Sequence, residues 1–235
     1  KHVSIAMGLF TSPQVMNSLE ELFGELRALG KMILEDKTYS AKTMDELYSL
    51  GERISSLLVS DLLRLRIPNK KIQLLDARKI IKTNSDFLAA EPQVSLIIEQ
   101  ADKLMNPFLK EEIIFVTQGS DYSAALFGEA IGASLVQIWT DVPGVASTDP
   151  RIVAGAKFIN HLSYDEATAL ATLGAKVLFP TTLKPAQRKN IPVFVGSSLN
   201  PEKGGTRITN EQDKGFSLKG VSQLLRADGS ALISF

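Results

Sequence analysis

Apolar residues recur every three or four positions through two long stretches near the start of the chain. The first stretch covers residues 13–35, and the second covers residues 43–62, just before the Pro68-Asn69 pair. This spacing is that of one face of an α-helix, and Pro and Asn commonly end such a helix. We therefore predict two long amphipathic helices in this part of the chain.

Short apolar runs alternate with helical patterns through the rest of the chain. The runs at residues 72–75, 113–117, 135–139 and 191–196 read as strands, and a turn at Gly204-Gly205 leads into another at 206–208. Helical patterns cover residues 94–104, 120–131, 163–173 and 183–189. Such alternation predicts an α/β fold with a mainly parallel sheet covered on both faces. Residues 216–235 look rich in strands.

The segment from residue 120 to residue 151 carries the clearest functional pattern. Ser120 and Asp121 stand where a helix should begin, and Gly132 can end that helix. Thr140 and Asp141 follow the next strand directly. Helix starts bind anions, and ligands of open α/β sheets bind beyond the carboxyl ends of strands. This order of elements predicts a nucleotide-dependent enzyme.

Composition removes several other classes of function. The chain has 26 basic and 26 acidic residues among 235, so a dedicated nucleic-acid binder is not expected. It contains no Cys and two distant His residues, which argues against thiolate or histidine metal sites. No apolar run is long enough to span a membrane and no signal-peptide pattern opens the chain. We expect a cytoplasmic protein without membrane or nucleic-acid partners.

Two residues leave alternatives open when they are considered alone. Gly51 stands inside the second helix, where Gly costs roughly 1 kcal/mol relative to Ala. It can mark the close approach of a ligand beside Glu52, or it can be a packing Gly next to a solvated Glu. Trp139 is expected in the core, although it could instead floor a ligand pocket.

Several motifs together resemble one known family. They are Gly51-Glu52, the segment 76–84, the motif Gly119-Ser120-Asp121, and the segments 136–151, 174–178 and 191–206. Most of residues 40–208 resembles the catalytic domain of aspartate kinases, within the amino-acid kinase family. The resemblance implies a three-layer αβα sandwich with a mainly parallel central sheet. Residues 1–210 would be the catalytic domain, and residues 211–235 a linker and the start of an ACT-type regulatory domain.

The resemblance also implies an activity. Aspartate kinases transfer the γ-phosphoryl group of ATP to the β-carboxylate of L-aspartate with Mg²⁺, the first step of lysine, threonine and methionine biosynthesis. It further implies a homodimer that is inhibited by an end-product amino acid, lysine or threonine. No dedicated protein metal site is expected. Two alternatives stay open: a catalytically inactive subunit that senses an amino acid or nucleotide, and another member of the amino-acid kinase family.

On the substrate side, the resemblance assigns three residues. Glu52 would bind the α-ammonium group of aspartate, and Ser120 would contact the substrate. Asp121 would be catalytic, since it would orient the groups that hold the phosphates. Without the resemblance, Asp121 is simply an acidic partner of the helix dipole.

Four further residues would hold the nucleotide. Thr140 and Asp141 would contact it, Arg151 would meet its phosphates, and Lys176 would add positive charge. Without the resemblance, Lys176 could be a solvated charge past a helix end.

Two segments that the resemblance implies are missing from this sequence. One is an N-terminal Lys-Phe-Gly-Gly-Thr-Ser loop, whose lysine would stabilise the transferring phosphoryl group. The other is a Gly-rich loop with a substrate-binding Arg, expected between Gln118 and Gly119, which here follow one another directly. We interpret both as disordered loops that this sequence omits.

Overall fold

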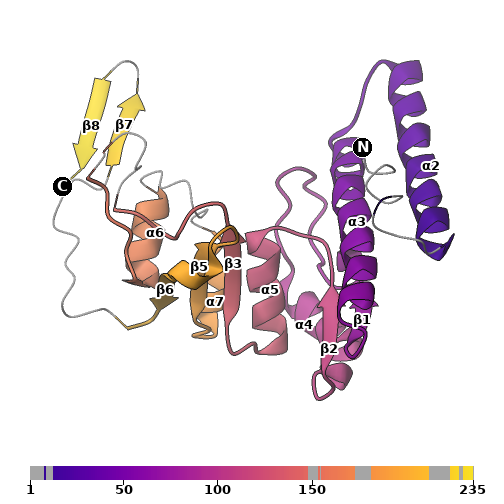
Figure 1. Cartoon of the computed structure of the whole chain (residues 1–235). Coiled ribbons are helices and arrows are strands. Elements are labelled where there is room, and N and C mark those ends of the chain that lie inside the picture. The colour runs from indigo at the N-terminus through magenta and orange to yellow at the C-terminus, as the bar shows by residue number, and fades with distance from the viewer. Residues whose placement is uncertain are drawn as a thin grey trace. The chain divides into compact units, whose positions relative to one another are not determined.

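The computed structural model describes residues 8, 13–147, 153, 155–172, 181–211, 223–227 and 230–234. The chain divides into two compact units (Figure 1), which we call the N-terminal unit (residues 1–119) and the C-terminal unit (residues 120–235). This division falls inside the predicted catalytic domain. The predicted boundary at residue 210 stays a prediction.

The N-terminal unit contains two long helices, as their periodicity predicts. They are α2 (Pro13–Asp36) and α3 (Ala41–Arg66). Their facing apolar stripes form a small core that includes Leu19, Leu50 and Ile54. The start of α3 is capped by Ser40, whose Oγ accepts a 3.1 Å hydrogen bond from the backbone N–H of Thr43.

A two-stranded parallel sheet completes this unit. Strand β1 (Lys71–Leu74) pairs with β2 (Ile113–Val116), with Ile72 opposite Ile114. The crossover between them contains η1 (Ala77–Lys79), α4 (Val94–Leu104) and η2 (Asn106–Phe108). Because both strands run in the same direction, their carboxyl ends lie at one edge of the sheet.

The C-terminal unit is built on a four-stranded sheet in the order β3-β5-β6-β4. Its strands are β3 (Val136–Thr140), β4 (His161–Ser163), β5 (Val193–Ser197) and β6 (Gly205–Thr209). Its helices are α5 (Asp121–Ile131), α6 (Tyr164–Thr172), α7 (Lys184–Arg188) and the short η3 (Pro201–Lys203). The predicted α/β class with a mainly parallel sheet is confirmed.

One pairing in this sheet is antiparallel. Strand β3 is parallel to β5, and β4 is parallel to β6, but β5 and β6 run in opposite directions. Gly196 therefore lies opposite Gly205, so β6 starts at the edge where β5 ends.

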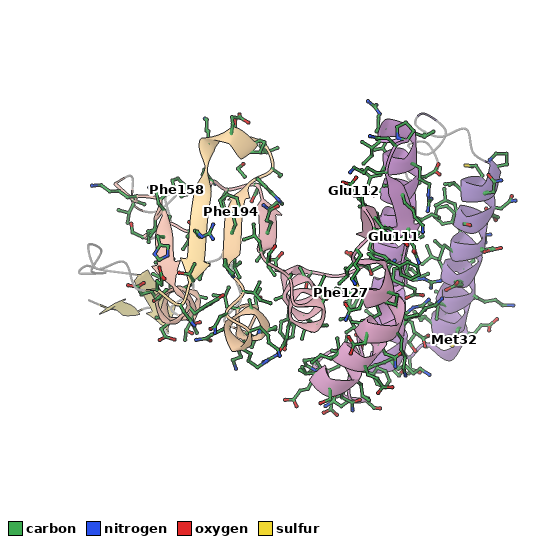
Figure 2. All side chains as sticks on the ribbon, turned by 90° about the horizontal axis from the view of Figure 1, so that it is seen from below. Met32, Glu111, Glu112, Phe127, Phe158 and Phe194 are labelled. Atoms are coloured by element: carbon green, nitrogen blue, oxygen red, sulfur yellow. The ribbon has the colours of Figure 1, made fainter. Side chains whose placement is uncertain are left out.

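The two faces of the four-stranded sheet differ in burial. Val136, Ile138, Val193 and Val195 point into the core formed with the helices, which gather on one side of the strands in Figure 2. Trp139 lies on the opposite face, is 44% exposed, and meets the Phe194 ring edge to face at 5.6 Å between centroids. The expectation that Trp139 is a core residue is therefore wrong, because its position in β3 alternates outward.

Helix α6, within the predicted helical range 163–173, begins at a capping box. The backbone N–H of Ser163 donates to the Glu166 carboxylate at 2.8 Å, and the N–H of Glu166 donates to Ser163 Oγ at 3.2 Å. The next residue, Tyr164, is almost fully buried and donates its hydroxyl proton to the carbonyl of Ile191. Its burial raises the pKa of Tyr164 to about 12.

A buried ion pair joins α5 to α7. The Arg188 guanidinium donates to both carboxylate oxygens of Glu129, at 2.8 and 2.5 Å. The Glu129 side chain is 4% exposed and that of Arg188 is 44% exposed. The Glu129 carboxylate raises the pKa of Arg188, so the guanidinium stays charged in the folded unit.

The tail contains two strands, as its composition suggests. Strand β7 (Gln223–Ala227) pairs antiparallel with β8 (Ser230–Ser234). Among the helices that the structure describes, none combines the length and the hydropathy needed to cross a bilayer.

Candidate functional site

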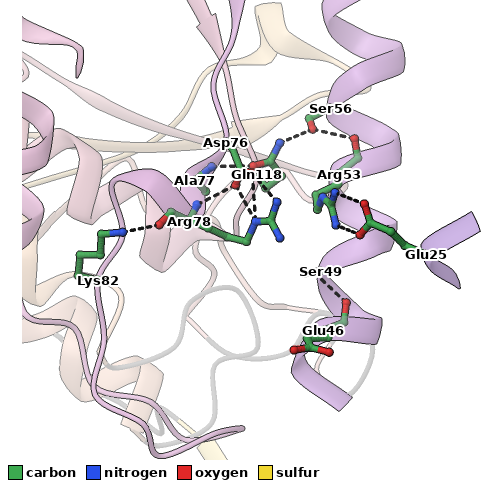
Figure 3. A network of polar contacts seen from close by, with 10 residues as sticks. All are labelled: Glu25, Glu46, Ser49, Arg53, Ser56, Asp76, Ala77, Arg78, Lys82 and Gln118. Carbon is green, nitrogen blue, oxygen red and sulfur yellow. Dashed lines mark hydrogen bonds and ion pairs between the residues drawn. The ribbon is translucent and has the colours of Figure 1, made fainter. Parts of the chain in front are cut away.

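In the N-terminal unit, polar side chains gather just beyond the carboxyl end of β1 (Figure 3). Asp76 caps η1 by accepting the backbone N–H of Arg78 at 3.0 Å. The same carboxylate accepts from the Arg78 guanidinium at 2.9 Å through Nε and 2.5 Å through Nη2. These hydrogen bonds from Arg78 hold the pKa of Asp76 below its usual range. The loop after β1 is thus fixed by charge-assisted contacts.

Gln118, two residues beyond the end of β2, links this loop to α3. Its Oε1 accepts from the backbone N–H of Ala77 at 2.7 Å, and its Nε2 donates to Ser56 Oγ at 2.6 Å. Ser56 in turn donates to the carbonyl of Arg53 at 3.1 Å. No local sequence pattern marks Gln118, because these partners lie 41 and 62 positions away in the chain.

Arg53 ties α3 to α2. Its guanidinium donates two hydrogen bonds to the Glu25 carboxylate, at 2.5 and 2.8 Å, and its side chain is 17% exposed. The hydrogen bond from Arg53 lowers the pKa of Glu25. A pocket of about 440 Å³ opens beside this pair, between α2, α3 and Arg78.

Glu52, the predicted substrate-binding residue, is exposed on α3. Within the described parts of the chain it forms no hydrogen bond or ion pair, so its carboxylate is free to meet a ligand. A Cβ added to Gly51 would find no atom of the described residues within 4 Å. Close packing against another segment therefore does not explain this glycine, and the approach of a ligand stays a prediction.

In the C-terminal unit, the predicted helix start is confirmed. Ser120 is the residue before α5 and has extended backbone angles, but its side chain makes no capping hydrogen bond. Asp121 is the first residue of α5 and is partly buried, and this burial raises the pKa of its carboxyl group. The Ser120 hydroxyl and the first N–H groups of the helix can therefore serve an anionic ligand.

Thr140 and Asp141 lie together at the carboxyl end of β3. The Thr140 hydroxyl donates to the Asp141 carboxylate at 3.1 Å, and Asp141 is exposed. The Thr140 carbonyl accepts from the N–H and the hydroxyl of Ser198, at 2.8 and 2.9 Å. The ends of β3 and β5 thus form one polar edge, as expected for a ligand site in an α/β sheet.

Gly144 turns the chain after this edge. Its φ is +146°, and an added Cβ would stand 2.6 Å from Oγ1 of Thr206. That hydroxyl accepts the N–H of Val145 at 2.8 Å and donates to the Ile159 carbonyl at 2.6 Å. Only Gly fits here, and the Thr206 hydroxyl fixes the loop that follows the predicted nucleotide edge.

The candidate residues fall into three groups. Glu52 belongs to the N-terminal unit, and Ser120, Asp121, Thr140 and Asp141 belong to the C-terminal unit. Arg151 and Lys176 lie outside the residues that the structure describes. Within the described ranges, no cluster of three or more His, Cys, Asp or Glu residues could hold a metal ion.

The sequence profile of the amino acid kinase family matches residues 9–197. The lysine-sensitive aspartokinase 3 of Escherichia coli K12 is 45% identical over 186 residues, which are 72% of this chain and 41% of that protein. The aspartokinase of Chlamydia pneumoniae is 38% identical over 173 residues, covering 68% of this chain and 39% of that protein. The chain thus spans less than half the length of these two relatives.

Solved structures agree with these matches. A crystal structure of E. coli aspartokinase III in complex with aspartate and ADP aligns with a TM-score of 0.84 and 39% identity. The alignment covers 91% of this chain and 50% of that one. The same enzyme with lysine and aspartate aligns with a TM-score of 0.80 and 38% identity, over 91% of this chain and 51% of that one.

Proposed function

Because this chain belongs to the amino acid kinase family, we propose that it is the catalytic region of an aspartate kinase. The reaction transfers the γ-phosphoryl group of ATP to the β-carboxylate of L-aspartate and yields 4-phospho-L-aspartate and ADP. The observation that carries this proposal is the likeness to E. coli aspartokinase III, whose structure contains aspartate and ADP.

The positions of the substrate-side residues support this function. Glu52 carries an exposed carboxylate that has no partner among the described residues and suits the α-ammonium group of aspartate. Ser120 and Asp121 stand at a helix start, where backbone N–H groups stabilise negative charge. The reaction brings two anions together, so positioning and charge stabilisation supply most of the catalysis. Asp121, partly desolvated, would orient the cationic groups around the transferred phosphoryl group.

On the nucleotide side, we assign binding to the polar edge of β3. Thr140 and Asp141 would contact ATP, and Arg151 and Lys176 would neutralise its phosphates. Mg²⁺ fits this assignment, because it is commonly held by one or two carboxylates together with substrate phosphates and needs no protein cluster. When bound, it would neutralise phosphate charge, and the exposed carboxylate of Asp141 would be the group that helps to hold it.

One relative supports a proposal about regulation. E. coli aspartokinase III was crystallised with lysine as well as with aspartate. We propose feedback by an end-product amino acid, lysine or threonine, through the region after residue 210, and a homodimer as the working assembly. Size-exclusion chromatography with light scattering tests the assembly, and acyl-phosphate formation with and without each amino acid tests the feedback.

Acyl-phosphate formation tests the activity directly. The product is trapped with hydroxylamine and measured with ATP and either L-aspartate or L-glutamate. Product from aspartate alone, lost in Asp121→Ala, is expected. The matched control is Asp165→Ala, which removes an exposed acidic residue from the first turn of α6. Equal product from glutamate would contradict the assignment.

A second function is favoured by one observation. Gln118 is followed directly by Gly119, so no Arg-bearing loop stands between β2 and α5. A subunit that binds amino acid or nucleotide without transferring phosphate would tolerate this arrangement. Calorimetric binding of aspartate or ATP without any hydroxamate product would support this sensing function.

A further inference from the structure

Three hydrogen bonds connect the carboxyl end of the parallel strands to the helix that carries Glu52. They run from the Ala77 N–H to Gln118 Oε1, from Gln118 Nε2 to Ser56 Oγ, and from Ser56 Oγ to the Arg53 carbonyl. We call these three bonds the Gln118 bridge (Figure 3). The side-chain partner in α3, Ser56, is 6% exposed.

The chemistry of the partners defines the orientation of the amide. A backbone N–H can only donate, so the atom of Gln118 that faces Ala77 must be the oxygen. The NH₂ group then faces Ser56, whose own proton goes to the Arg53 carbonyl. Each of the three bonds thus has one donor and one acceptor, and the amide has one orientation that satisfies all three bonds.

Helical geometry relates this bridge to the proposed substrate residue. Glu52 and Ser56 are four positions apart, so they share one face of α3 with an axial separation of about 6 Å. Ser56 is held at the carboxyl end of β2. Glu52 lies one turn closer to the start of α3, on the same face.

The other contacts of this part of α3 do not tie it to the strand ends, because the Arg53 guanidinium, next to Glu52, binds the Glu25 carboxylate of α2. Ile54, Leu57 and Leu58 pack through apolar contacts, which have no preferred direction. Gly51 lowers the intrinsic stability of the turn that holds Glu52. Hydrogen bonds are directional, so the bridge sets the helix register relative to the strand ends.

We propose that Gln118 is a positioning residue for the substrate ammonium site, acting through Ser56 on the turn that carries Glu52. This inference rests on the proposed aspartate kinase function. A shift of about 1 Å in a binding group is enough to lower activity strongly. Loss of the bridge therefore weakens aspartate binding and leaves nucleotide binding unchanged.

The test uses Gln118→Met, which keeps the length of the side chain and removes both polar groups, and Ser56→Ala. Matched controls are Gln93→Met and Ser55→Ala, which make the same or similar changes at exposed positions. Steady-state kinetics should show an aspartate KM raised about tenfold in either variant, since each loses hydrogen bonds in the bridge. The ATP KM and kcat should stay within about twofold of the unaltered chain.

The double variant separates positioning from general destabilisation. Because both residues act in one chain of bonds, Gln118→Met with Ser56→Ala should raise the aspartate KM no further than either change alone. An unchanged aspartate KM, or an equal rise in the ATP KM, would overturn the proposal. A lower melting temperature with unchanged KM would show that Gln118 is only structural.

Amide hydrogen exchange gives a readout that does not need activity. The Ala77 N–H should exchange faster in Gln118→Met, because its acceptor is gone. If the unaltered chain makes no acyl phosphate, the proposed function is wrong, and so is the role of Gln118 in the reaction. Faster exchange of the Ala77 N–H in Gln118→Met would still show that the bridge forms. Unchanged exchange at Ala77 would show that the bridge does not form.

Discussion

The ion pair between Glu129 and Arg188 allows a quantitative prediction about the C-terminal unit. Arg188→Met removes both hydrogen bonds to a carboxylate that is 4% exposed. Leaving one partner of a buried pair uncompensated costs about 3–5 kcal/mol. Arg188 is itself 44% exposed, so water can partly replace it. We therefore expect a loss of about 2–4 kcal/mol in the free energy of unfolding.

The assay follows urea unfolding through tryptophan fluorescence. Trp139 is the only tryptophan in the sequence and lies in the same unit as the ion pair. With a urea dependence of about 1–3 kcal/mol per molar, the midpoint should fall by roughly 1–2 M. Arg207→Met is the matched control, because Arg207 is an exposed arginine of β6. It should leave the midpoint nearly unchanged.

A double variant distinguishes a broken pair from lost packing. In Glu129→Leu with Arg188→Met, no charge is left buried, and apolar replacements of buried pairs are often neutral or stabilising. The double variant should therefore be more stable than Arg188→Met alone. A double variant as unstable as the single one would refute this reasoning, as would a midpoint shift below about 0.5 M.

Three further predictions concern single positions. Gly144→Ala should lower stability by about 1–3 kcal/mol in thermal melts, because its Cβ would displace the Thr206 hydroxyl from the Val145 N–H. Tyr164→Phe should cost about 1–3 kcal/mol below pH 10, since it leaves the buried carbonyl of Ile191 unpaired. Asp121→Asn should abolish hydroxamate formation yet raise the melting temperature at pH 7.

The pH dependence of the last two variants follows from the direction of each pKa shift. Tyr164 has a folded pKa of about 12 against an ordinary value of 10.0, so its contribution is present below pH 10 and is lost as pH rises toward 12. Tyr164→Phe should lack that alkaline loss. Burial raises the pKa of Asp121 from 3.8, so its charged form opposes folding above that pH. The advantage of Asp121→Asn should disappear in melts at pH 3, and its persistence there would contradict this account.

Local patterns predicted the helices well. Helix α4 has the predicted limits, residues 94–104, and α6 (Tyr164–Thr172) falls within the predicted range 163–173. These features depend on residues within one or two turns of each other, which a sequence displays directly. The start of α5 was predicted as well, although the Ser120 hydroxyl does not serve as its cap.

Features that depend on distant residues were harder to predict. The bonds of Gln118 join three segments that the sequence does not mark as neighbours. The length of the connection does indicate the reversed direction of β6. Only residues 198–204 separate β6 from β5, whereas a parallel crossover needs about a dozen residues or more. Trp139 was assigned to the core from its residue type, whereas the strand period sets its outward direction. Roles for Glu52, Ser120, Asp121, Thr140 and Asp141 stay predictions.

The reversal between β5 and β6 determines where the tail leaves the catalytic scaffold. Strand β6 begins beside Gly196, near the proposed nucleotide edge, and ends at Thr209 at the opposite edge of the sheet. Four residue steps of about 3.3 Å separate its two ends by roughly 13 Å. A regulatory region attached after Thr209 would therefore begin away from the proposed nucleotide edge. A displacement of that region along the axis of β6 would be transmitted to the start of the strand. Thr206, whose hydroxyl accepts the N–H of Val145 in the loop after Gly144, would transmit that displacement to the proposed nucleotide edge.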